Sequence, residues 1–130
     1  MIADTTFLID LMNGNKDAVQ KLQNLSQKRE QLHVTAISIF ELYRGISRSG
    51  RPLKESEKIL SVLQGVSTLS LEPASAQVAG EIEGKLFKDG RAIGSVDCMI
   101  AGIAITQSEK LLTRNVKDFS KISGLQVESY

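Results

Sequence analysis

Residues 95–104 form the almost wholly apolar run SVDCMIAGIA, with one carboxylate, Asp97, near its start. Ile100, Ile103 and Ala104 recur at the spacing of one helix face. The pattern predicts a buried helix with Asp97 in its first turn. Two interpretations of this carboxylate stay open: a charge that complements the helix dipole, or a member of a functional site at the edge of the core.

The composition is that of an ordinary globular protein. The chain has 130 residues, 42% of them hydrophobic and 24% charged, which suits one domain over residues 1–130. The net charge of +1 gives no overall field that would draw the chain onto nucleic acid. A single cysteine, no visible signal peptide and no membrane-length apolar run predict a cytoplasmic protein that does not cross a membrane.

Short apolar runs alternate with segments that carry apolar residues at helical spacing. The strand-like runs lie at residues 1–3, 32–37, 67–71, 110–113 and 125–128. This alternation predicts an α/β fold with three layers, in which helices cover both faces of a central parallel sheet. The two helices within Ile37–Val66 are expected to form a hairpin arm.

Some helix boundaries and contacts are also expected from local sequence. Asp17 can begin the second helix, and Ser38 can cap the helix after the second strand. Ala76, Gly80 and Gly84 recur every fourth residue, which predicts that another backbone approaches that side of the helix closely.

Four acidic residues occupy comparable places in this pattern. Asp4 follows the first strand directly, and Asp118 comes just after the strand at 110–113. Asp97 opens the apolar helix, and Glu41 lies early in the helix after the second strand. Because ligands of parallel sheets bind beyond the carboxyl ends of the strands, the four side chains are expected to converge at one edge of the sheet.

A cluster of carboxylates favours a particular chemistry. Crowded carboxylates repel one another and raise one another's pKa, and a divalent cation removes that conflict. Hard oxygen ligands suit Mg²⁺ or Mn²⁺. One or two such ions would activate water and stabilise the charge that develops on a phosphodiester. The sequence therefore favours hydrolytic phosphate chemistry.

Each acid also has a simpler explanation. Asp4 could cap the first helix, and Asp118 could be a turn residue. Glu41 could lie on a solvated helix face, where Arg44 at i+3 would form a weak ion pair with it. The single histidine is expected to be a strand residue, and the single cysteine a small core residue.

Two other acidic-site folds are poor matches. A phosphatase of the haloacid-dehalogenase type needs a second aspartate two residues after its nucleophile, but Thr5 and Thr6 follow Asp4. A receiver-like signalling domain needs a phospho-accepting aspartate after a central strand, and Ser67–Glu72 offers none.

Four blocks of sequence carry a resemblance to a known family. They are IADTTFLI at 2–9, SIFELYRG at 38–45, DCMIA at 97–101 and LTRNVKDF at 112–119. In that order and at those intervals they resemble the PIN-domain family, and most closely its VapC-type ribonuclease toxins of prokaryotic toxin–antitoxin pairs. The resemblance covers essentially the whole chain.

The resemblance implies a Mg²⁺- or Mn²⁺-dependent endoribonuclease. Asp4, Glu41 and Asp97 match the acidic triad of the family, which binds metal and acts in catalysis. Asp118 matches the fourth acid, although Asn115 competes for that position. The residues expected to line the site or to contact RNA are Thr6, Thr113, Asn115 and Arg44.

The resemblance also implies partners. Members of the family usually form homodimers, and an antitoxin silences them by placing its tail in the acidic groove. The RNA substrate stays open and includes tRNA, ribosomal RNA and mRNA. Basic residues of the hairpin arm could meet RNA phosphates or antitoxin acids, or could simply be solvated; they are Arg44, Arg48, Arg51 and Lys54. The alternative function is a PIN fold without catalysis that serves as a partner-binding module.

Overall fold

The computed structural model describes all of residues 1–130, and a five-stranded sheet lies at its centre. The strand order is β3-β2-β1-β4-β5, and all four pairings are parallel. The strands are β1 (Ile2–Ala3), β2 (His33–Thr35), β3 (Ser67–Leu69), β4 (Leu111–Leu112) and β5 (Val127–Glu128). The parallel sheet predicted from the alternating pattern is confirmed.

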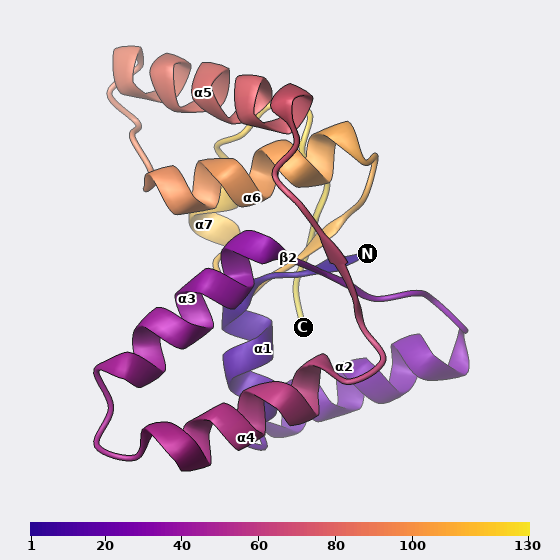
Figure 1. The fold of residues 1–130 in the computed structure, drawn as a ribbon. Helices are drawn as coiled ribbons and strands as arrows, with labels where there is room; N and C mark the ends of the chain where they lie inside the picture. Colours follow the sequence, from indigo (N-terminus) through magenta and orange to yellow (C-terminus); the bar gives the residue numbers. More distant parts are fainter.

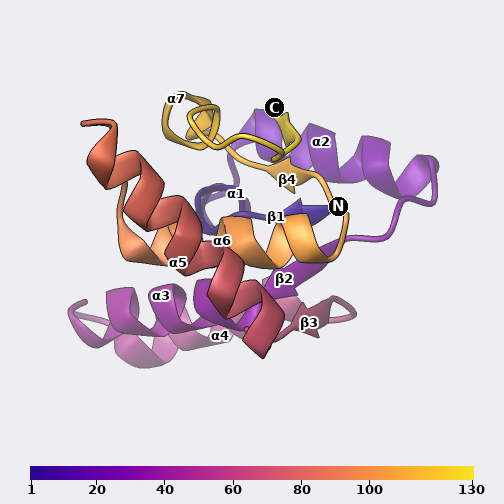
Figure 2. The ribbon, with the colours of Figure 1, turned by 90° about the horizontal axis from the view of Figure 1, so that it is seen from above.

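Seven helices surround this sheet. They are α1 (Thr5–Met12), α2 (Lys16–Gln27), α3 (Ala36–Ser47), α4 (Pro52–Leu63), α5 (Pro73–Lys88), α6 (Ser95–Thr106) and α7 (Val116–Phe119). In Figure 1, α5 and α6 lie above the strands, whereas α1, α2 and α4 lie below them. Figure 2 shows the same layers from above, with α3 and α4 paired as the expected hairpin. None of the helices has both the length and the apolar run needed to cross a bilayer.

The side chains of β1 and β4 contribute to two hydrophobic cores, one on each face of the sheet. Side chains alternate between the two faces of a strand, so Ile2 and Leu111 join the core under α5 and α6. Ala3 and Leu112 join the core against α1, α2 and α4. All four side chains are fully buried. Helix α6 contributes most of its apolar residues to the first core, as the 95–104 run predicts.

The sequence pattern placed two helix starts too late, that of α2 by two residues and that of α3 by three. Helix α2 is capped by Asn15, whose side chain accepts a hydrogen bond from the backbone N–H of Ala18, and not by Asp17. Helix α3 is capped by Thr35, whose hydroxyl accepts from the backbone N–H of Ser38 at 3.0 Å. A capping oxygen must reach an N–H two or three residues along the chain, and in both helices the earlier residue does so.

Helix α5 does have a close backbone neighbour, but not at the glycines where the sequence predicts it. A Cβ atom added at Gly80 or Gly84 would have no other atom within 4 Å, so the predicted contact there is wrong. The close approach is made instead by Gly102 of α6. A Cβ atom there would lie 2.5 Å from the backbone oxygen of Ser75 and 3.0 Å from Cβ of Ala79. Helix α6 therefore rests against α5 at a point where only hydrogen fits.

This contact generates a test of the packing. We expect Gly102→Ala to lower the free energy of unfolding by about 1–3 kcal/mol, because the new methyl group meets fixed backbone. Gly80→Ala is the matched control, since the same methyl group there has open space and should stabilise the helix by about 0.5–1 kcal/mol. Urea denaturation of both variants measures the change in the free energy of unfolding, which should be a loss for Gly102→Ala and a gain for Gly80→Ala. Equal changes would contradict the assigned contact.

Candidate active site

The acidic residues sit where three adjacent strands end. Asp4 follows β1 and occupies the N-cap position of α1, and Glu41 lies in α3 directly after β2. Asp97 lies in the first turn of α6, and Asp118 lies in the short helix α7 after β4. Since β2, β1 and β4 are neighbours and parallel, their carboxyl ends form one edge of the sheet.

The charge environment of Asp97 shows that these carboxylates act on one another. The pKa of Asp97 is raised from 3.8 to about 6, first by burial and then by the negative charges of Asp4, Glu41 and Asp118, in that order. A helix N-terminus by itself would stabilise the ionised form and lower the pKa. The interpretation of Asp97 as a charge that only complements the helix dipole therefore does not account for its surroundings.

Asp4 is the most deeply buried of the four, with 2% of its surface exposed. It does not cap α1 with its side chain, which excludes the simple capping explanation. Instead its Oδ2 accepts hydrogen bonds from the hydroxyl of Thr113 at 2.7 Å and from that of Thr6 at 3.0 Å. Both threonines, which the sequence placed at the site, thus fix one oxygen of Asp4.

Glu41 is held from two sides. The Thr5 hydroxyl donates to its Oε1 at 2.6 Å, and Nη2 of Arg44 lies 3.5 Å from its Oε2. The Arg44 guanidinium also lies 5.2 Å from the ring centroid of Phe40. The predicted ion pair at i+3 is therefore present, but Glu41 is not fully solvated, because 20% of its side chain is exposed.

Two hydroxyl residues of the site were missed from the sequence. Thr5, which holds Glu41, also lies 3.0 Å from the hydroxyl of Ser38, and both residues are buried. The available signal was the polar pair that follows Asp4 and the hydroxyl residues at the end of β2. Sequence alone does not show which of two adjacent threonines turns toward Asp4 and which toward Glu41.

Asp118 is the most loosely held member. Its Oδ2 accepts from the side-chain amide of Asn115 at 3.2 Å, its Oδ1 lies 3.4 Å from Nζ of Lys121, and 37% of its side chain is exposed. The hydrogen bond from Asn115 and the charge of Lys121 lower its pKa. The backbone N–H of Asn115 also donates to the hydroxyl of Thr113. Asn115 thus lies between Asp118 and the group that holds Asp4.

The side chains that could bind a metal ion at this edge have the chemistry that suits a hard cation. All of them offer carboxylate, hydroxyl or amide oxygens, the ligand set that Mg²⁺ and Mn²⁺ prefer. No three His, Cys, Asp or Glu side chains stand close enough to share one ion in this arrangement. Glu41 accepts a hydrogen bond from Thr5 and Asp118 accepts one from Asn115, so both carboxylates already have partners of their own.

Nitrogen and sulfur ligands are absent from the site. His33 begins β2 and so lies at the opposite edge of the sheet, where its Nδ1 is 2.5 Å from the hydroxyl of Ser67. Cys98 is fully buried, and burial together with nearby negative charge raises the pKa of its thiol to about 11. Both residues have the structural roles expected from the sequence.

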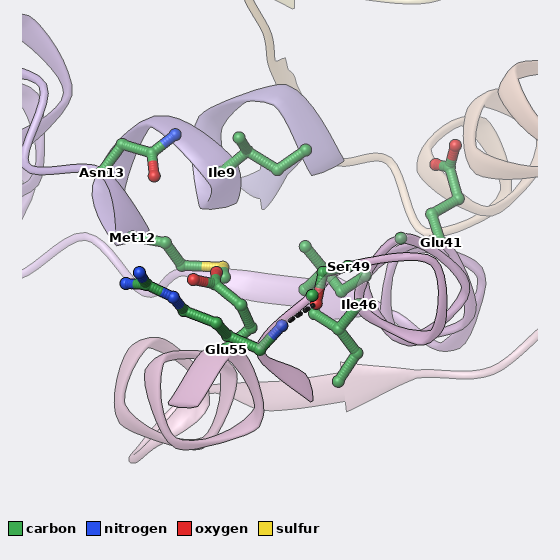
Figure 3. A pocket seen from close by; sticks show the side chains of 11 residues that line it. Ile9, Met12, Asn13, Glu41, Ile46, Ser49 and Glu55 are labelled. Carbon is green, nitrogen blue, oxygen red and sulfur yellow. Dashed lines mark hydrogen bonds between the residues drawn. The ribbon is translucent and has the colours of Figure 1, made fainter. Parts of the chain in front are cut away.

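A groove opens beside Glu41 between α1, α3 and α4. Its volume is about 460 Å³, and apolar side chains such as Ile9 and Met12 line it together with Asn13 and Glu55. Figure 3 shows Glu41 at one end of this groove, with its carboxylate turned outward from α3. The acidic edge is therefore continuous with a partly apolar surface on the hairpin arm.

The sequence matches the family model described as PIN domain over residues 1–125. The chain belongs to the PIN-domain family. The resemblance drawn from the four sequence blocks is thus confirmed, as is the three-layer α/β fold that it implies.

Curated relatives of this PIN domain carry ribonuclease names. One is the "tRNA(fMet)-specific endonuclease VapC" of Shigella flexneri, 28% identical, with 98% of this chain and 95% of the relative covered. Another is "Ribonuclease VapC1" of Rickettsia felis, 32% identical, with 98% and 93% covered. The similarity therefore extends along nearly the whole length of both chains.

Solved structures place the PIN domain among toxin–antitoxin proteins. A chain in the crystal structure of VapBC2 from Rickettsia felis, bound to a DNA fragment from its promoter, superposes with a TM-score of 0.91 at 25% identity, covering 99% of this chain and 97% of that one. A chain in the structure of VapBC-1 from nontypeable Haemophilus influenzae superposes with a TM-score of 0.85 at 28% identity. The superposition covers 98% of this chain and 96% of that one.

The raised pKa of Asp97 generates a test in metal-free buffer. Because the pKa is about 6 in the folded protein and near 3.8 when unfolded, the ionised form destabilises the fold. This loss in the free energy of unfolding is absent below about pH 4, grows as the pH rises and reaches its full size above about pH 6. We expect Asp97→Asn to raise the free energy of unfolding by about 1–3 kcal/mol near pH 8 and by almost nothing near pH 4.

Asp118→Asn is the matched control for this measurement. The pKa of Asp118 is lowered by Asn115 and Lys121, so its ionised form is favoured in the folded protein and the variant should gain no stability near pH 8. Chemical denaturation with EDTA across this pH range measures both variants. A gain for Asp97→Asn that is the same at every pH would rule out charge repulsion as its cause.

Proposed function

We propose that this chain is a Mg²⁺- or Mn²⁺-dependent endoribonuclease, the toxin of a toxin–antitoxin pair, that acts as a single domain in the cytoplasm. The observation that carries the proposal is the set of mutually repelling carboxylates around Asp97 at the carboxyl edge of the sheet. The ribonuclease names of the curated relatives and the VapBC structures support the same function.

The proposed ligands are Asp4, Glu41, Asp97 and Asp118. Asp4 keeps Oδ1 free of hydrogen bonds while two threonines fix its Oδ2, so one oxygen is oriented in advance. Burial and the acidic neighbours disfavour the ionised form of Asp97, so a bound cation would stabilise it. A bound Mg²⁺ or Mn²⁺ ion would supply Lewis-acid chemistry toward water and the phosphodiester.

The neighbouring side chains have supporting roles in this proposal. Thr6 and Thr113 hold Asp4, and the amide of Asn115 orients Asp118 or takes its place as the fourth ligand. Arg44, beside Glu41, presents a cation at the rim where an RNA phosphate would approach. These residues bind and orient, and the carboxylates accept or hold protons.

The partners follow from the same site. An antitoxin would cover the acidic edge and continue into the groove beside Glu41, whose lining is partly apolar. The RNA substrate is proposed to be tRNA or another structured RNA, as the name of the Shigella relative indicates for that protein. We also propose a homodimer, and exposed aromatic side chains such as Phe40 and Phe87 are available for its interface.

Cleavage of a total-RNA pool tests the proposal. The purified protein, shown to be free of antitoxin, is incubated with Mg²⁺, with Mn²⁺ or with EDTA. We expect discrete products only with metal, and a loss of at least about 100-fold in rate for Asp97→Asn, more than the removal of an outer-shell partner costs. Asp17→Asn, an exposed acid in α2, is the control and should cleave like wild type.

A second readout separates catalysis from partner binding. Thermal melting with and without Mn²⁺ should show a higher midpoint with metal for wild type and a much smaller shift for Asp97→Asn. Absence of both cleavage and a midpoint shift would overturn the enzyme proposal and favour the non-catalytic binding module. Cleavage that Asp97→Asn leaves intact would identify a contaminating nuclease.

A further inference from the structure

Arg114 is held in an unusual way next to the acidic site. Its Nη1 lies 2.7 Å from Oδ1 and 3.0 Å from Oδ2 of Asp10, a carboxylate that is only 6% exposed. The Tyr130 hydroxyl donates to the same Oδ2 at 2.6 Å, and its ring packs edge-on against the fully buried Phe7 at 4.9 Å. One buried carboxylate thus fixes a guanidinium and a tyrosine.

The same arginine remains open to solvent. Its side chain is 61% exposed, and its Nε and Nη2 make no hydrogen bond within the protein. An ion pair whose cation stays exposed adds little to stability, so stability alone gives little reason for this arrangement. Here one nitrogen anchors the group on Asp10, and the donors on Nε and Nη2 remain available to another ligand.

The backbone places this cation at the edge of the carboxylate cluster. The backbone N–H of Arg114 donates to the Thr6 hydroxyl at 3.1 Å, and that hydroxyl donates to Asp4. Asp10 lies six residues after Asp4 on α1, roughly 9 Å along the helix axis. The guanidinium is therefore beside the acidic cluster and not within it, so it does not neutralise the proposed metal ligands.

We propose that Arg114 binds a phosphate of the RNA backbone that flanks the scissile phosphodiester, and that Asp10 and Tyr130 are its positioning residues. The inference rests on the proposed ribonuclease function. RNA must approach an edge lined with carboxylates, and a chain with a net charge of +1 supplies no general attraction. A pre-oriented guanidinium provides that attraction at one place and fixes the register of the strand.

The test measures RNA binding separately from cleavage. A fluorescein-labelled, single-stranded RNA of mixed sequence is titrated with protein in EDTA at several salt concentrations. We expect Arg114→Ala to weaken binding about 10-fold at low salt and to reduce the slope of log affinity against log salt by about 0.7, the loss of one phosphate contact. Arg114→Lys keeps the charge, so it should keep the slope and lose only part of the affinity.

Asp10→Asn separates positioning from charge. This variant removes a negative charge and would strengthen RNA binding if only net charge mattered, whereas loss of orientation at Arg114 would weaken it. We expect weaker binding, and a smaller loss for Tyr130→Phe, which keeps the contact with Phe7. Lys28→Ala, an exposed residue after α2 near the opposite edge of the sheet, is the control and should change neither affinity nor slope beyond a small amount.

The outcomes distinguish this inference from the proposed function. If wild type binds RNA and Arg114→Ala has the same affinity and salt slope, the inference alone is overturned. Arg114 would then bind an acidic protein partner or have a purely structural role. Stronger binding by Asp10→Asn would overturn the positioning role. No RNA binding by wild type would overturn the proposed function and this inference together. Melting curves of each variant confirm that it is folded.

Discussion

Repulsion between carboxylates is the constraint on which the rest of this structure depends. Three neighbouring strands and helix α6 bring Asp4, Glu41 and Asp97 to one edge. Burial first, and then the negative charges of its acidic neighbours, raise the pKa of Asp97 to about 6, so its ionised form costs about 1–3 kcal/mol in this half-buried place. The apolar residues of α6 offset this cost, because burying each isoleucine stabilises by about 1.5–3 kcal/mol and two of them, Ile100 and Ile103, are almost fully buried.

Hydroxyl groups govern how the acidic edge is arranged. Thr113, directly after β4, and Thr6 of α1 both donate to Asp4, and Thr5 of α1 donates to Glu41 of α3. Each of these hydroxyls can both donate to a carboxylate and accept from a backbone N–H, as Thr6 does from the residue after Thr113. The site is therefore linked across strands that are far apart in sequence, and its geometry depends on the pairing of β1 with β4.

The fold and the acidic residues were predictable because their signals are periodic or local. The alternation of strands and helices, and the position of Asp97 in an apolar helix, are visible in the residue pattern. The contact at Gly102 was not predictable, because the close packing of α5 and α6 depends on which faces meet in three dimensions. The same reason hid Thr5 and Asp10, whose partners lie more than thirty residues away.

The pairing of β4 with β1 has a consequence for the order of events during synthesis. This strand pairs with β1 and is followed by Thr113, yet in the sequence it comes after β2, β3 and α6. A ribosome-bound chain that has released only β1, β2 and β3 has Asp4 without its Thr113 hydroxyl and without the neighbouring strand that fixes it. The acidic edge is consequently incomplete until β4 has emerged from the ribosome, and a nascent chain has no finished site while only its first three strands can fold.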